Sequence, residues 1–105
     1  MIFDRWRAKS TASRSQAKAA QVAFVEFAAT HPGTQAWVEQ ASGFNKASLL
    51  LVAGDGEWLR RTVPDIDWAR RFAQDAKLTC FAAGIDPYPQ RMRDWDAAHR
   101  PPRKA

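Results

Sequence analysis

KASLLLVAGDGEWLRRTV, residues 46–63, contains the two strands around which the rest of the chain has to pack. Residues 49–52 form an uninterrupted apolar run, which indicates a strand buried on both faces near the centre of a sheet. Asp55-Gly56 is a favoured dipeptide for a two-residue hairpin turn, because both residues tolerate positive φ. The sequence therefore predicts antiparallel strands over 46–53 and 57–63, with Ala53 opposite Trp58.

The returning strand, 57–63, divides its side chains between the two faces of the sheet. Alternation places Leu59 and Val63 on one face, and Trp58 and Arg60 on the other. We expect the first pair to belong to the core. The second face then carries an aromatic and a basic residue side by side.

Further elements follow from capping, turn and periodicity signals on both sides of this hairpin. Ser13 with Gln16 fits a capping box and predicts a helix start, while Pro32 and Gly33 end that helix. Asp65 is a good N-cap for a second helix. The remaining predicted elements are strands over 34–41 and 78–84, a turn over 42–45 and a helix over 90–100.

These elements predict an α+β fold in the order α-β-β-β-α-β-α, with helices packed on a small, mainly antiparallel sheet. The predicted domain boundaries are a basic flexible arm over 1–12, a single domain over 13–100 and a disordered tail over 101–105. We expect the first two helices to cover one face of the sheet through Phe24, Phe27 and Phe72. The last helix should cover part of the other face with Met92 and Trp95, close to Trp58.

Composition limits the class of protein. The chain has 105 residues and a net charge of +5, and its basic excess lies in residues 1–18 and 91–105. Basic ends of this kind attract polyanions without reading their sequence. No apolar run is long enough to span a bilayer, and we see no export signal. With Cys80 as the single cysteine, these features predict a cytoplasmic protein that does not associate with membranes.

Catalytic and metal-binding patterns are weak. His31, Cys80 and His99 lack the close spacing of metal ligands, so we predict no metal and no cofactor. A small carboxylate-dependent hydrolase remains an alternative, and it would use the four acids near the hairpin and the second helix: Asp55, Glu57, Asp65 and Asp67. We predict no catalytic residue, because turn and capping roles already explain Asp55 and Asp65.

Nucleic-acid binding is a stronger alternative. The order α-β-β-β-α over 13–77 is that of a double-stranded RNA-binding domain, but PDIDWARR at 64–71 places acids where that family has lysines. Aromatic and basic residues nevertheless alternate on the strand and the last helix, as in surfaces that stack bases and hold phosphates. The candidate binding residues are Trp58, Arg60, Tyr88, Arg91, Arg93 and Trp95. Alternatively, the aromatic residues close the core and the arginines pair with Asp94 and Asp96.

Protein binding is the third class. Five tryptophans are many for a core of this size, and Trp and Arg are typical interface anchors. GEWLRRTVPD (56–65) and YPQRMRDW (88–95) resemble segments of small actinobacterial proteins of unassigned function, a resemblance that implies no activity and no site. We therefore predict a small basic binding or regulatory module without catalysis. Its partner would be a protein or, non-specifically, nucleic acid, and the sequence does not predict the oligomeric state.

Overall fold

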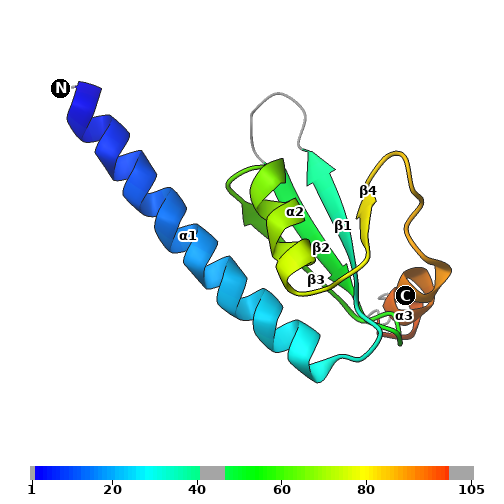
Figure 1. Cartoon of the computed structure of the whole chain (residues 1–105). Helices are drawn as coiled ribbons and strands as arrows, with labels where there is room; N and C mark the ends of the chain where they lie inside the picture. Colours follow the sequence, from blue (N-terminus) through cyan, green and yellow to red (C-terminus); the bar gives the residue numbers. More distant parts are fainter. Residues whose placement is uncertain (1, 41–46, 100–105) are drawn as a thin grey trace, which may run out of the picture.

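The computed structural model describes residues 2–40 and 47–99, with side chains from residue 14 onward. Its elements follow the predicted order, and the α+β class is confirmed (Figure 1). No helix in this part of the chain combines the length and the apolar character needed to cross a bilayer. The elements are α1 (Ile2–Thr30), β1 (Gln35–Gln40), β2 (Ala47–Val52), β3 (Trp58–Val63), α2 (Ile66–Asp75), β4 (Cys80–Ala82) and α3 (Gln90–His99).

The four strands form one sheet in the order β3-β2-β1-β4. β2 pairs antiparallel with both β1 and β3, while β4 runs parallel to β1. The apolar strand β2 is therefore central, as its sequence predicts. The predicted register is wrong by one residue, because Val52 rather than Ala53 lies opposite Trp58.

A longer hairpin loop accounts for this shift. The Gly56 amide donates to the Ala53 carbonyl at 3.0 Å, and the Ala53 amide donates to the Glu57 carbonyl at 2.8 Å. Gly56 has φ +98, whereas Asp55 does not adopt positive φ. This is a three-residue loop in which a turn over 54–55 is followed by a glycine bulge. The extra residue moves each residue of β3 one position along β2.

Other predicted boundaries also change. α1 begins at Ile2, well before Ser13, because no glycine or proline interrupts the chain between residue 1 and Pro32. β4 is shorter than the predicted strand over 78–84, since the residues after Ala82 turn back on themselves: Asp86 accepts a hydrogen bond from the Ala82 amide at 3.1 Å. The predicted turn over 42–45 and the tail over 101–105 lie outside the described residues.

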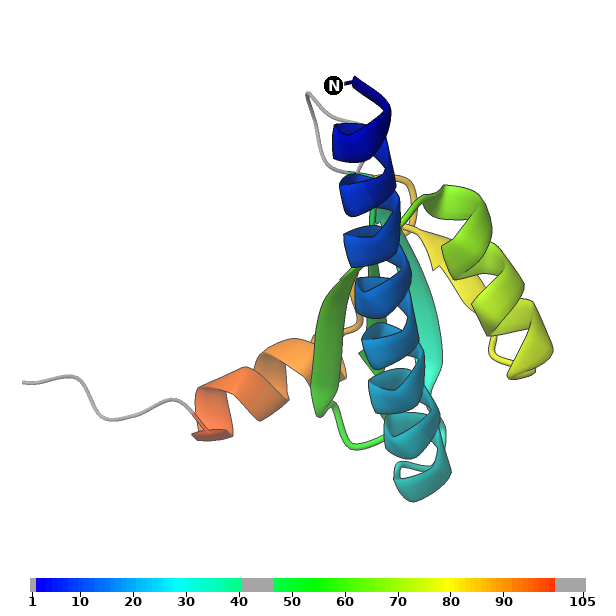
Figure 2. The ribbon, with the colours of Figure 1, turned by 90° about the vertical axis from the view of Figure 1, so that its left-hand side faces the viewer.

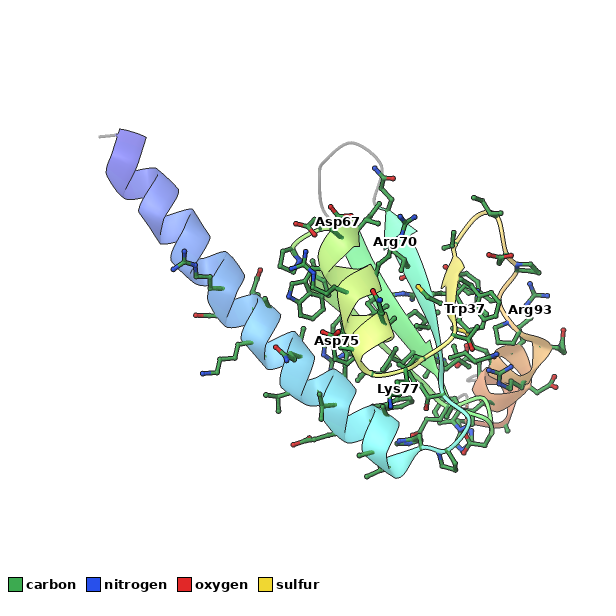
Figure 3. All side chains as sticks on the ribbon, in the orientation of Figure 1. Trp37, Asp67, Arg70, Asp75, Lys77 and Arg93 are labelled. Atoms are coloured by element: carbon green, nitrogen blue, oxygen red, sulfur yellow. The ribbon has the colours of Figure 1, made fainter. Side chains whose placement is uncertain are left out.

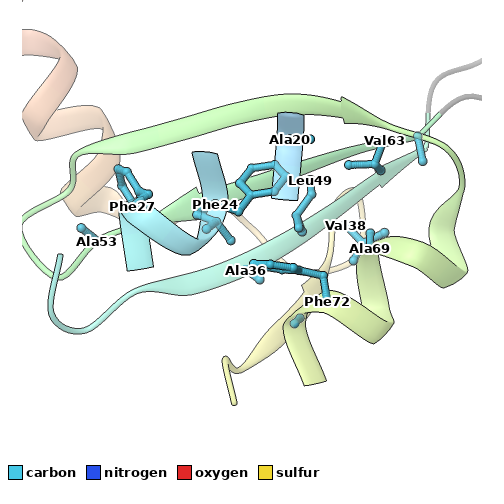
Figure 4. Packing of buried hydrophobic residues seen from close by; sticks show 13 residues of the cluster. Ala20, Phe24, Phe27, Ala36, Val38, Leu49, Ala53, Val63, Ala69 and Phe72 are labelled. Atoms are coloured by element: carbon cyan, nitrogen blue, oxygen red, sulfur yellow. The ribbon is translucent and has the colours of Figure 1, made fainter. Parts of the chain in front are cut away.

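The larger core lies between one face of the sheet and helices α1 and α2 (Figure 4). Phe24 of α1 is fully buried, and its ring lies 5.5 Å from that of Phe72 in α2. Leu49 and Leu51 of β2 point into the same cluster. We call this side of the sheet the first face. Its two predicted covering helices are confirmed.

A smaller core occupies the second face, where α3 packs (Figure 2). It contains Trp37 of β1, Leu50 and Val52 of β2, and Met92 of α3, all buried. The predicted contact of α3 with this face, close to Trp58, is confirmed for Met92, whereas Trp95 is not part of this core.

Candidate functional site

The predicted binding residues Trp58, Arg60 and Tyr88 come together on the second face. Strand register places Arg60 beside Leu50, which lies beside Trp37. The Arg60 guanidinium lies 5.4 Å from the centre of the Trp58 ring, within range of a cation–π contact. Aromatic and basic groups are therefore adjacent here, as the sequence predicts.

Arg60 is already engaged by a residue that the sequence analysis missed. Its Nε and Nη2 atoms donate to the two carboxylate oxygens of Glu39 at 2.7 and 2.9 Å. This bidentate geometry is the strongest form of arginine–carboxylate contact. The hydrogen bond to Glu39 raises the pKa of Arg60 above its ordinary value. A phosphate could not form a paired contact with Nε and Nη2 of this guanidinium without displacing Glu39.

Tyr88 donates its hydroxyl to the same carboxylate of Glu39. Burial, and then the hydrogen bond to Glu39, raise the pKa of the Tyr88 phenol. Its ring is tilted against that of Trp37, with the centroids 6.2 Å apart. The Tyr88 side chain therefore closes over the small core, and its polar end is held by an acceptor within the protein.

The start of α3 is held against the hairpin by hydrogen bonds. Arg91 Nε donates to the Ala53 carbonyl at 2.9 Å, and Arg91 Nη2 donates to the side-chain oxygen of Gln35 at 2.6 Å. A Cβ atom on Gly56 would lie 2.0 Å from the Arg91 carbonyl oxygen, so the hairpin and the helix backbone are in direct contact. Arg91 thus positions α3.

The middle of α3 is held in a similar way. Trp58 Nε1 donates to Asp96 Oδ1 at 2.7 Å, which links β3 to the helix. Trp95 is half-buried and stacks on His99, with the ring centroids 3.9 Å apart. Arg93 is exposed and extends from α3 (Figure 3). Five of the six predicted residues therefore take part in internal contacts, and Arg93 is the exception.

The four acids proposed for a hydrolase do not converge. Asp55 accepts the Glu57 amide at 2.9 Å inside the hairpin loop, and Asp65 caps α2 by accepting the Trp68 amide at 2.7 Å. Strand β3 separates the two groups by six residues, about 20 Å of extended chain. Within 2–40 and 47–99, no three His, Cys, Asp or Glu residues are grouped as metal ligands would be.

His31 joins the end of α1 to the hairpin. Its ring stacks on Phe27, Nδ1 is hydrogen-bonded to the Phe27 carbonyl at 2.8 Å, and Nε2 contacts the Glu57 carboxylate. The Gly54 amide also donates to the Pro32 carbonyl at 3.0 Å. These contacts give His31 a packing role at the end of α1.

A groove of about 330 Å³ lies on the outer side of the first-face helices, between α1 and α2. Its walls include Val25 of α1 and the stacked rings of Trp68 and Phe72 in α2. Arg71 and Asp75 lie at its rim, and Figure 3 shows Asp75 on α2. Sequence reasoning missed this groove, because it depends on how the two helices are placed.

A second hollow, of about 280 Å³, borders β4 and includes Cys80. Burial raises the pKa of the Cys80 thiol, which disfavours the reactive thiolate. Nothing at Cys80 therefore indicates nucleophilic chemistry.

Comparisons of this chain with protein-family models, with curated proteins and with solved structures gave no match.

Proposed function

We propose that this protein is a small non-enzymatic binding module, and that it binds another protein through the outer side of α1 and α2. The observation that carries the proposal is the apolar surface there. Val22 and Val25 are each 52% exposed, and Val25 continues into the groove formed by Trp68 and Phe72. A polar rim around apolar and aromatic residues is typical of protein interfaces.

The second face supports the proposal by contrast. A surface that stacks bases and binds phosphates needs free guanidinium groups and open aromatic rings. Arg60 and Tyr88 share Glu39 as a partner, while Trp58 is bound to Asp96. These contacts favour a structural role for the aromatic and basic residues, so nucleic-acid readout on the sheet is the weaker alternative. We also propose a cytoplasmic location, and the actinobacterial resemblance remains a prediction.

A photo-crosslinking experiment in the cells that make the protein tests this function. A benzophenone amino acid replaces Gln21, which lines the groove, or Gln90, which is exposed on α3 as the control. We expect protein adducts from position 21, lost when Trp68→Ala is added, and none specific to position 90. Adducts to nucleic acid alone, or adducts at both positions that Trp68→Ala does not change, would contradict the proposal.

Non-specific polyanion binding is a second candidate, favoured by the basic excess at residues 1–18 and 91–105. Such binding weakens steeply with salt, with a log–log slope of about 0.9 for each phosphate contacted on duplex DNA. We expect deletion of 1–12 and 101–105 to remove most of the affinity measured by fluorescence anisotropy. Sequence-selective binding that survives both deletions would instead place a nucleic-acid reader in the folded domain.

A further inference from the structure

Helix α1 carries two stripes, and only one of them faces the core. Ala20, Phe24 and Phe27 are buried against the sheet. A second set recurs with spacings of three and four residues on the opposite side of the helix, and every member is exposed. We call this set the outer stripe, and its members are Ser15, Lys18, Val22, Val25 and Ala29.

The outer stripe has the composition of a helix–helix contact. Its spacing is that of the a and d positions of a heptad repeat, and Ala19 and Glu26 flank it. Val22 and Val25 supply apolar side chains at its centre, and small residues at either end allow another helix to approach closely. α1 leaves this side open along the described part of the molecule (Figure 2).

The charges on and beside the outer stripe indicate which helix could pack against it. Lys18 lies four residues before Val22, and Glu26 lies four residues after it. In an antiparallel pair of α1 helices with its two-fold axis at Val22, Lys18 of each copy faces Glu26 of the other. A parallel pair would instead oppose like charges. Among the described side chains, neither Lys18 nor Glu26 lies within ion-pair distance of an opposite charge.

We infer that the outer stripe binds a second copy of this chain, forming an isologous antiparallel dimer of α1 helices centred on Val22. A contact of this kind is closed by its own symmetry, so it yields a dimer and not a filament. The inference rests on the proposed function, because Val22 and Val25 belong to the proposed protein-binding surface. It names a second copy of the chain as the partner of that part of the surface. The groove residues Trp68 and Phe72 remain available to a different partner.

Analytical ultracentrifugation of the full chain over a range of concentrations tests the inference. We expect a monomer–dimer equilibrium, and Val22→Asp should give a monomer. Lys18→Glu or Glu26→Lys should each weaken the dimer about tenfold or more, because two attractive pairs become repulsive. The double variant Lys18→Glu/Glu26→Lys restores opposite charges and should restore the dimer. Lys77→Glu changes the net charge by the same amount as Lys18→Glu, at an exposed position just after α2, and serves as its control.

The orientation is tested separately by disulfide cross-linking in a Cys80→Ser background. Ser15→Cys mixed with Ala29→Cys should cross-link, because residues 15 and 29 are equally distant from Val22. Ala29→Cys alone should not cross-link, and efficient cross-linking of that variant alone would indicate a parallel pair and overturn the inference. A chain that stays monomeric, a dimer unaffected by the single charge reversals, or a double variant that fails to recover would also overturn it. A monomer that still yields Trp68-dependent adducts from position 21 would overturn the self-association and leave the proposed function standing.

Discussion

The two faces of the sheet are covered by different physical means. The first face is closed by α1 and α2, whose buried side chains are all apolar. The second face is covered in part by α3, in which Met92 is the one buried residue among those described. Hydrogen bonds of Trp58 with Asp96 and of Arg91 with Ala53 supply the rest of that contact, and Tyr88, just before the helix, donates to Glu39. Helices can thus be attached to one sheet mainly by packing or mainly by polar contacts.

This difference assigns roles to residue types that look alike in the sequence. On the second face, Trp58, Arg60 and Tyr88 are held by acidic partners within the protein, so their presence does not indicate a ligand. The indole N–H of Trp37 is buried there without a hydrogen-bond partner among the described residues. On the outer side of the first-face helices, Val22 and Val25 are exposed to water, and Val25 adjoins the groove. Contact with a partner would remove this apolar surface from water, which is favourable. These observations favour a binding surface on the solvent-facing side of α1 and α2 over one on the sheet.

The largest effect on stability should come from the first face. Phe24→Ala removes a fully buried ring and should cost about 3–5 kcal/mol of unfolding free energy. Met92→Ala should cost about 2 kcal/mol, the lower end for such truncations, because α3 contacts the sheet along one side only. Chemical denaturation of the two variants checks this order. Equal losses would show that the two faces contribute alike.

Gly56 joins the hairpin to α3, so substitution there should affect the second face selectively. Gly56→Val combines positive φ with a clash against the Arg91 carbonyl, and should cost about 3 kcal/mol. Asp55→Asn is the matched control and should change stability by less than about 0.5 kcal/mol, because asparagine suits the same turn. Thermal unfolding, with limited proteolysis of α3, measures both. A loss for Asp55→Asn as large as that for Gly56→Val would contradict the structural role of this turn.

Tyr88 is the only tyrosine, so the ultraviolet absorbance of tyrosinate reports its ionisation directly. Its pKa in the folded protein should lie above the ordinary value of 10.0. Because the folded-state pKa is raised, the protonated phenol stabilises the fold below pH 10.0, and this contribution is lost as the pH rises through the folded-state pKa. Tyr88→Phe should therefore lose less stability than the wild type on going to high pH.

Glu39→Gln isolates the cause of this shift. It should lower the Tyr88 pKa part of the way toward the ordinary value, since burial remains, while Asp94→Asn should leave it unchanged. A Tyr88 pKa at or below the ordinary value in the wild type, left unchanged by Glu39→Gln, would contradict the contact with Glu39.

The fold was predictable because its signals are local. The apolar run of β2, the N-cap Asp65 and the helix-ending Pro32 each act within a few residues, and each is confirmed. The register of β3 was predicted wrongly because the loop Gly54-Asp55-Gly56 contains two glycines and allows two placements of the turn. In the structure, Gly56 is the loop residue with positive φ. Sequence alone does not show which pair of residues forms the turn.

The hydrogen-bond partners on the second face are residues that lie far apart in the sequence. Glu39 of β1 reaches Arg60 of β3 across β2, because β1 and β3 are the two neighbours of β2 in the sheet. No local sequence pattern predicts that strand order. Alternation could have placed Glu39 on the same face as Trp37, which was the one signal available in the sequence. The outer stripe of α1 was missed for a related reason. The sequence does not show which side of α1 packs against the sheet, and therefore which side stays exposed.

The most direct test of the account is a double-mutant cycle on Trp58 and Asp96, measured by equilibrium unfolding. The central claim is that Trp58, Arg60 and Tyr88 on the second face are held by the carboxylates of Asp96 and Glu39 in the same chain, and not by a ligand. Trp58→Phe removes the indole donor, and Asp96→Ala removes its acceptor. We predict that each substitution destabilises the protein and that the two are coupled by about 1 kcal/mol, the size expected for a partly exposed hydrogen bond to a carboxylate. Additive effects with no coupling, together with loss of nucleic-acid binding by folded Trp58→Phe, would contradict the claim and return the sheet face to the status of a ligand site.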